Sequence, residues 1–193
     1  MRVRALESGT LTLLLLAACA GDDAGDAAAR ADTTAGATLA ATPPRVTATM
    51  RDLAGRELGT LSLAQAGDAI AVSGHLTGLA PGEHAIHLHA TGRCEGPDFK
   101  SAGTHWNPTG VDHGSESATG PHFGDLRNIS ADADSMAMVQ DTTPGGTLSG
   151  TGAEALLDAD GAAVIIHSGS DDYRSQPSGN AGTPVACGVV SGG

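Results

Sequence analysis

Short runs in which apolar and polar residues alternate fill the chain from Arg45 onward. They are rich in β-branched residues, and turn-forming residues separate the first three of them at 52–55 and 66–68. Side chains alternate between the two faces of a sheet, so each run predicts a strand. The runs cover residues 46–50, 57–65, 68–79, 133–140, 162–167 and 184–190.

No long stretch shows a helical period, and residues 154–157 would form one helical turn at most. Short strands separated by glycine-rich turns indicate an all-β sandwich or barrel. Two connections are long. About forty residues lie between the strand that holds His87 and His89 and the predicted strand at 133, and sixteen lie between His167 and Pro184. Long loops without secondary structure are usually functional or disordered. Because the first of these loops holds histidines and the second directly follows His167, we expect both to be functional.

The amino terminus has the pattern of an export signal. Arg2 and Arg4 precede an apolar segment, 11–18, which is much shorter than the roughly 20 residues that a membrane-spanning helix needs. The segment ends in Leu-Ala-Ala-Cys19, which resembles a bacterial lipobox and implies cleavage before Cys19 and lipidation of its sulfur. An ordinary secretory signal is the alternative. Both readings predict an exported protein.

Residues 19–44 contain almost nothing bulky to bury, so we predict a flexible tether there and a folded domain at 45–193. The formal net charge of the chain is −12. This charge argues against a nucleic-acid partner, and the glycine-rich loops lack the spacing of a phosphate cradle.

Six of the eight histidines lie between residues 82 and 125. Neutral imidazole suits copper and zinc, so this density predicts a metal centre. His87 and His89 point to the same side of a strand, and His167 ends another apolar run. His84 has the opposite parity and is expected to be structural.

The long loop offers three histidines and one carboxylate, a set that would satisfy tetrahedral zinc: His105, His113, His122 and Asp125. Spacing alone does not assign each histidine to a metal.

Five segments resemble, in order, the signature blocks of the copper/zinc superoxide dismutases, and especially of exported bacterial members. They read GEHAIHLH, SAGTHWNP, GPHFGD, VIIHSGSDDY and GNAGTPVACGVV. The similarity covers essentially residues 45–190. It implies a Greek-key β-barrel of about eight antiparallel strands with two long functional loops, and an oxidoreductase that converts superoxide to dioxygen and hydrogen peroxide.

The resemblance also implies the role of each site residue. The catalytic copper would be held by His87, His89, His105 and His167. His105 would bridge to zinc, which His113, His122 and Asp125 would complete. Asp171 would connect a copper histidine to a zinc histidine, a role that fits the need to orient imidazole ligands.

The same resemblance pairs two of the cysteines, whereas the lipobox-like sequence assigns the third cysteine and the location. Cys94 and Cys187 would form the intrasubunit disulfide of the family, while Cys19 carries lipid. The expected location is the periplasmic face of a bacterial envelope membrane, or the cell surface. Ala20 favours the outer membrane over the inner one, because the aspartate that often signals inner-membrane retention is missing there. No patch in the sequence indicates an oligomeric state.

The sequence departs from the family at one functional position. Pro184 stands where the family has an arginine beside the copper. A fixed guanidinium attracts an anion and donates hydrogen bonds to it, and proline does neither. We therefore expect slower capture of superoxide, with Arg174 and Lys100 as candidate substitutes in the two long loops.

Two other functions remain open at this point. One is a copper- and zinc-binding protein of the same fold that buffers or delivers metal, which Pro184 favours. The other is a structural adhesion sandwich with incidental metals, which does not account for seven ligands in register.

Overall fold

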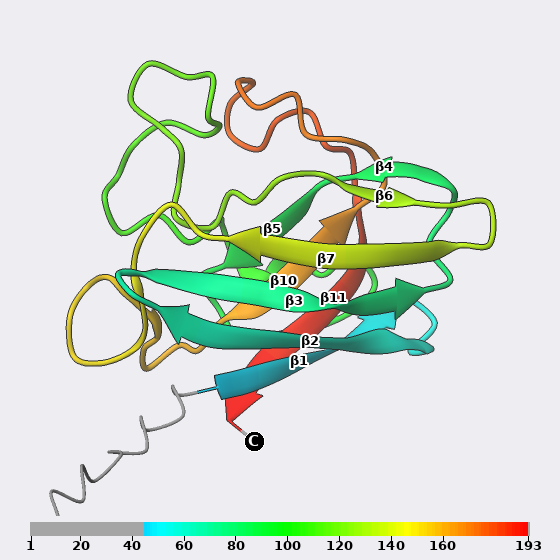
Figure 1. Cartoon of the computed structure of the whole chain (residues 1–193), viewed down its shortest axis with the longest axis horizontal. Coiled ribbons are helices and arrows are strands. Elements are labelled where there is room, and N and C mark those ends of the chain that lie inside the picture. Colours follow the sequence, from blue (N-terminus) through cyan, green and yellow to red (C-terminus); the bar gives the residue numbers. More distant parts are fainter. Residues whose placement is uncertain (1–44, 193) are drawn as a thin grey trace, which may run out of the picture. The chain divides into compact units, whose positions relative to one another are not determined.

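The computed structural model describes residues 45–192, and within them the backbone forms eleven strands and one short 3-10 helix, η1 (Lys100–Ala102) (Figure 1). The strands are β1 (Arg45–Asp52), β2 (Glu57–Ala66), β3 (Ala69–Thr77), β4 (Gly82–His84), β5 (Ile86–His89), β6 (Ile129–Ala131), β7 (Met136–Thr142), β8 (Thr147–Ser149), β9 (Ala155–Leu157), β10 (Ala163–His167) and β11 (Pro184–Gly192).

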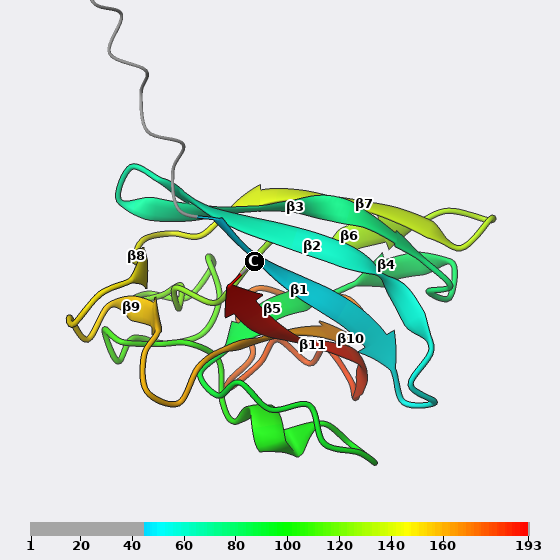
Figure 2. The same cartoon turned by 90° about the horizontal axis from the view of Figure 1, so that it is seen from below.

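Nine of these strands form one antiparallel sheet in the order β4-β6-β7-β3-β2-β1-β11-β10-β5. Its two edge strands, β4 and β5, are consecutive in the chain and are separated only by Ala85. The sheet therefore curls round until its edges belong to one interrupted strand, and the result is a nearly closed barrel (Figure 2). With β4 and β5 taken together, the sheet has the eight antiparallel strands expected from the sequence.

The all-β prediction is thus confirmed, with two local corrections. The helical turn considered for 154–157 is wrong, because Ala155–Leu157 is strand β9 and pairs in parallel with β8. The strand predicted at 133–140 begins later, at Met136, and a separate short strand, β6, precedes it. Local alternation does not reveal which residues pair with a neighbouring strand, so the predicted boundaries differ from the observed ones.

The barrel interior is aliphatic. Along β5, Ile86 and Leu88 are fully buried and join Leu61, Ile70 and Val164 in the main hydrophobic cluster. His87 and His89 alternate with these two residues along β5; they are also buried but point to the other face of the strand. Strand β5 therefore has the core on one side and the histidine cluster on the other.

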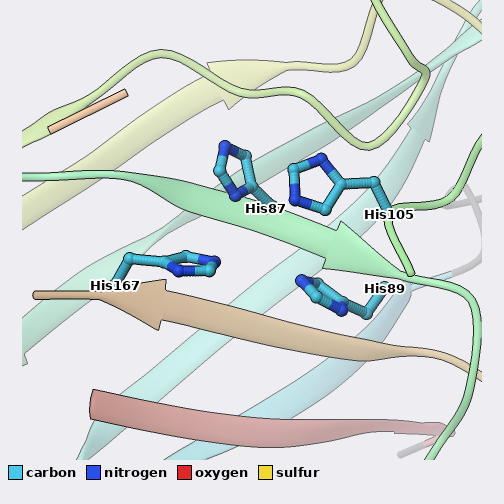
Figure 3. A group of neighbouring side chains, drawn as sticks. All are labelled: His87, His89, His105 and His167. Atoms are coloured by element: carbon cyan, nitrogen blue, oxygen red, sulfur yellow. The ribbon is translucent and has the colours of Figure 1, made fainter. Parts of the chain in front are cut away.

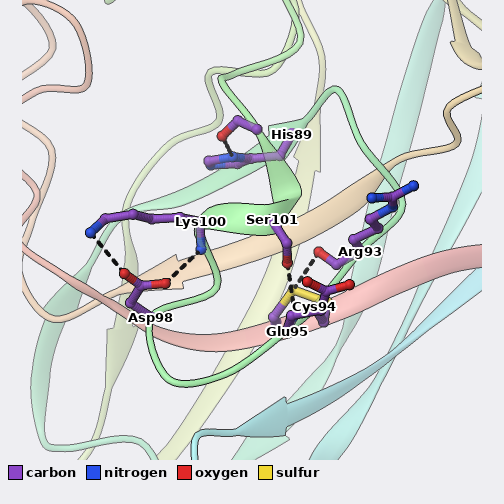
Figure 4. Close-up of a disulfide and its surroundings, with 9 residues drawn as sticks. His89, Arg93, Cys94, Glu95, Asp98, Lys100 and Ser101 are labelled. Carbon is purple, nitrogen blue, oxygen red and sulfur yellow. Dashed lines mark hydrogen bonds and ion pairs between the residues drawn. A yellow bond between two sulfur atoms is a disulfide. The ribbon is translucent and has the colours of Figure 1, made fainter.

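A disulfide attaches the first long loop to the barrel. Cys94 is bonded to Cys187 of β11, 93 residues away in sequence, as the resemblance implied. Phe99 and Ala102 of the same loop pack with Ile165 of β10 in a second, smaller cluster around Cys187. Figure 4 shows this loop folded back toward His89. The covalent link and the apolar contacts hold the loop where it meets the histidines.

The predicted signal (1–18), the tether (19–44) and Cys19 lie outside the described residues. In the part of the chain that the structure describes, no helix has the length and apolar character needed to cross a membrane.

Removal of the disulfide gives the first test. The pair Cys94→Ser/Cys187→Ser should lower the free energy of unfolding by about 4–5 kcal/mol, because a cross-link between distant residues restricts the unfolded chain. Urea denaturation of the metal-free protein measures the change, and Cys19→Ser serves as the matched cysteine control. Equal stability of the double variant and the control would contradict the stabilising role.

Candidate metal centre

Two neighbouring strands and the first long loop bring the predicted ligands together. Ile165 of β10 lies opposite His87 of β5, so His167 at the end of β10 extends past the same region. The loop pairs with β5 through two isolated bridges, His89 with His105 and His87 with Asp125. The backbone thus places residues from three segments of the chain at one site.

The first ligand group consists of four histidines whose ligand atoms all lie within 4.8 Å of one another: His87, His89, His105 and His167 (Figure 3). One ring nitrogen of each is buried and lacks a hydrogen-bond partner: Nδ1 of His87 and Nε2 of the other three. An unpaired buried polar atom is costly, so four in one place indicate a missing ligand.

The outward nitrogens of these rings are occupied. Nδ1 of His89 lies 2.8 Å from the carbonyl oxygen of Gly103, and Nδ1 of His167 lies 3.3 Å from that of Gly182. A carbonyl oxygen only accepts, so each of these nitrogens donates its proton, and the inward nitrogen of the same neutral ring keeps a lone pair for a metal.

The second ligand group contains His105, His113, His122 and Asp125. Oδ1 of Asp125 lies 2.8, 3.0 and 3.2 Å from Nδ1 of His105, His113 and His122, and the Nδ1 atoms of His105 and His122 are 3.4 Å apart. A tetrahedron with Zn–N bonds of about 2.0–2.1 Å has edges of roughly 3.3–3.4 Å. Four donor atoms at these separations fit a small tetrahedral ion.

His113 supports this fit in a second way. Its Nδ1 lies 3.0 Å from Oδ1 of Asp125, yet this buried nitrogen has no hydrogen-bond partner. The contact to Asp125 is therefore better described as two ligands facing the same point.

His105 belongs to both groups. Its Nδ1 faces Asp125, and its Nε2 is the unpaired atom of the first group. One imidazole thus separates the two candidate ion positions, as expected of a bridging ligand.

Asp171 connects the two groups from behind. Its Oδ2 accepts a hydrogen bond from Nε2 of His87 at 2.9 Å, and its Oδ1 accepts one from Nε2 of His113 at 3.0 Å. The backbone N–H of Tyr173 also donates to Oδ1. These bonds occupy the outward nitrogens of both histidines and fix the orientation of the two rings.

Apolar side chains next to the loop ligands fix their backbone. Trp106 follows His105 and is 4% exposed, and Leu126 follows Asp125 and is 2% exposed; both belong to the main core. His105 and Asp125 are thus each followed by a residue that packs in the barrel interior.

Burial controls the protonation of the first group. It lowers the pKa of His87 and of His89 to about 3 and that of His167 to about 4. It also lowers the pKa of His105. These rings are neutral at physiological pH, so protons do not compete with a metal there.

The second group behaves differently. Burial alone would lower the pKa of His113, but the adjacent carboxylates of Asp125 and Asp171 outweigh it and raise the pKa to about 9. Burial acts against ionisation of both aspartates, yet their hydrogen bonds to the histidines hold each pKa well below its usual range. In the metal-free protein, a proton on His113 occupies the second group at neutral pH.

The structure brings together every predicted ligand as well as Asp171. His84 is buried, and its ring nitrogens lie 2.7 and 2.8 Å from the carbonyl oxygens of His167 and Ala80, so it has the expected structural role.

Sequence reasoning missed Gly179. Its φ is +66°, and a Cβ there would collide with Asp171 and approach Nε2 of His113. A glycine before Asn180 in the second loop was the only available signal, and it does not reveal this close approach.

The position expected to carry the family's arginine lies beside the first group. Pro184 is the cross-strand neighbour of His167, at a register shift between β10 and β11. Both candidate substitutes are in ion pairs: Arg174 with Glu116, and Lys100 with Asp98 at 2.7 Å. Neither one is a free cation for an incoming anion.

The chain is similar to known proteins in sequence and in fold. A model of the family "Copper/zinc superoxide dismutase (SODC)" matches residues 57–190. The copper–zinc superoxide dismutase 1 of Aquifex aeolicus is 41% identical over 137 residues, which are 70% of this chain and 81% of the relative. The superoxide dismutase-like protein YojM of Bacillus subtilis is 40% identical over 115 residues, 59% of each chain.

Among solved structures, a double mutant of a SOD-like protein from Bacillus subtilis superposes with a TM-score of 0.72 at 34% identity. It covers 76% of this chain and 97% of that one. The chain therefore belongs to the copper/zinc superoxide dismutase family, and the prediction of copper and zinc as cofactors is confirmed at the level of the family.

The proton on His113 leads to a pH test. Zinc added to the metal-free protein should displace this proton, so its affinity should rise about tenfold per pH unit from pH 6 to 8 and level off near 9. Calorimetry in two buffers of different ionisation enthalpy counts the protons released, with one expected at pH 7.

A variant sharpens this test. Asp171→Asn removes one of the two carboxylates beside His113 and should move the plateau to lower pH, whereas Asp68→Asn in the distant β2–β3 turn should not. A zinc affinity that stays constant between pH 6 and 8 would contradict the assignment.

Proposed function

We propose that this chain is a superoxide dismutase, which converts two superoxide ions and two protons into dioxygen and hydrogen peroxide. The observation that carries the proposal is the pair of ligand groups that share His105. A protein that only stores one kind of ion has no need for a ring shared between two sites.

The chemistry of the donors assigns an ion to each group. Four imidazoles on two rigid strands and an anchored loop suit copper: His87, His89, His105 and His167. Three imidazoles and one carboxylate suit zinc: His105, His113, His122 and Asp125. When bound, copper would supply the one-electron redox couple that dismutation requires.

The residues of the chain have separate tasks in this scheme. The buried rings of His87 and His89 keep fixed, neutral donor atoms at the site. Asp171 prevents rotation of His87 and His113 through its two hydrogen bonds. His105 has one nitrogen in each group, so its Nε2 is the atom where a proton is held whenever that nitrogen is not a ligand.

Capture of superoxide is the step in which this chain should be weak. Proline at position 184 has no charge and no donor, and the net charge of the whole chain is −12. Arg174 and Lys100 are neutralised by their acidic partners. We therefore propose a dismutase with a reduced rate of anion capture.

The second candidate function is metal buffering or delivery by the same two groups, without significant dismutation. Pro184 beside His167 is the observation that favours it. The Bacillus subtilis relative belongs to the same family and is named superoxide dismutase-like, not superoxide dismutase.

Stopped-flow decay of superoxide separates the two functions. The protein loaded with one copper and one zinc should accelerate the decay beyond free copper, and removal of copper should abolish the effect. Pro184→Arg should increase the rate about tenfold or more at low salt, with a smaller gain at high salt because ions screen the new charge.

Pro184→Ala is the matched control for loss of the ring, and it should leave the rate low. Decay no faster than free copper in the parent protein would refute the dismutase. If Pro184→Arg then accelerated superoxide decay beyond free copper, metal handling would become the leading function of the parent protein.

We also propose that the protein is exported and held through lipid on Cys19 at the periplasmic face of an envelope membrane, the outer one if the cell has it, or at the cell surface. The lipobox-like sequence before Cys19 and the scarcity of bulky residues in 20–44 support this.

Fractionation tests the anchor. The parent protein should sediment with membranes, and Cys19→Ser should release it to the soluble fraction, since diacylation is the proposed attachment. Cys94→Ser/Cys187→Ser keeps Cys19 and should remain with the membranes. A parent protein recovered entirely in the soluble fraction would argue for an ordinary secretory signal.

A further inference from the structure

Strands β3 and β7 are neighbours in the barrel (Figure 1). Two methionines of β7 and one histidine of β3 are exposed at adjacent positions of this pair. Met136 and Met138 are consecutive outward positions of β7, with exposed fractions of 49% and 61%. His75 of β3 is the cross-strand partner of Met138 and is also exposed. We call these three residues the outer Met-His cluster.

The methionines are unusual for their positions. The other outward residues near them on β3 and β7 are small or polar, such as Ser73, Thr77 and Gln140. Within residues 45–192 the only other methionine, Met50, is fully buried in the core. Two of the three methionines there are therefore exposed beside an imidazole.

The spacing lets all three side chains reach one ion. Directly opposed residues in an antiparallel pair have Cβ atoms about 4.5–5.5 Å apart, and diagonal neighbours about 7–8 Å. His75 is directly opposite Met138 and diagonal to Met136. Methionine has three rotatable side-chain bonds, so its sulfur can turn toward a common point.

The donor chemistry selects the ion. Thioethers are soft ligands that favour Cu(I), and imidazole also binds copper, whereas magnesium, calcium and manganese prefer oxygen ligands. The set is uncharged when the imidazole is neutral, and the acidic protein around it attracts cations. A monovalent soft cation fits these donors better than a divalent one.

We propose that the outer Met-His cluster binds one Cu(I) ion at the surface of the barrel. This site shares no residue with the two ligand groups of the metal centre, and it does not depend on whether the centre dismutates superoxide. It would give the protein a separate position for reduced copper.

Silver(I) is a suitable probe, because it resembles Cu(I) and does not change oxidation state. The experiment uses the full chain with Cys19→Ser, which removes a competing thiol, loaded with copper and zinc in chloride-free buffer. Methionine methyl groups are labelled with carbon-13 and observed by NMR. One equivalent of silver should shift the Met136 and Met138 signals to saturation and leave Met50 unchanged, and zinc should shift none of them.

Variants show whether all three residues act together. Met136→Leu, Met138→Leu and His75→Asn should each weaken silver binding at least about tenfold, since even residues that only orient a ligand have effects of that size. Leucine keeps the apolar surface, so these substitutions separate an ion site from a patch that docks a partner. Met50→Leu is the matched control for loss of a buried sulfur.

Cu(I) itself, titrated without oxygen against bicinchoninate, completes the test. The parent should retain one more equivalent than Met136→Leu/Met138→Leu. The proposal is overturned if silver leaves both exposed signals unmoved, if Met50 shifts equally, or if the leucine variants bind as tightly as the parent.

Discussion

Crowding of buried imidazoles at one place is the constraint on which this structure depends. Five buried ring nitrogens of His87, His89, His105, His113 and His167 have no partner in the protein. Leaving such atoms unpaired costs about 1–3 kcal/mol each, so the fold without metal carries a substantial penalty at one place. The rest of the site keeps these nitrogens aimed at common points, where an ion can relieve the penalty.

The support for this arrangement comes from different parts of the chain. Asp171 of the second long loop joins one histidine from each group, and Gly179 leaves the room that its carboxylate needs. Trp106 and Leu126 tie the first loop to the barrel core next to two ligands. Most residues of the site lie in loops, and these core contacts and hydrogen bonds restrict the movement of the loops.

Sequence reasoning predicted the strands with strong alternation and the seven candidate ligands that the structure brings into two groups, because short segments around these residues have a recognisable pattern. It failed where pairing decides the structure: residues 155–157 became a strand only because β8 lies beside them. It also missed Gly179, and it had no means to find the carbonyl groups of Gly103 and Gly182 that set the histidine tautomers. Backbone contacts of this kind depend on the path of the loops and have no residue signature.

The separation of the candidate ligands along the chain affects the order in which folding and metal binding occur. His87 and His89 are two residues apart and can chelate an ion in an unfolded chain, whereas His167 is 78 to 80 positions away and joins them only after β10 has paired with β5. Contacts between distant segments form late in folding. A newly made chain thus passes through a stage in which it has a chelating pair and no centre, so ions bound at that stage favour the unfolded form.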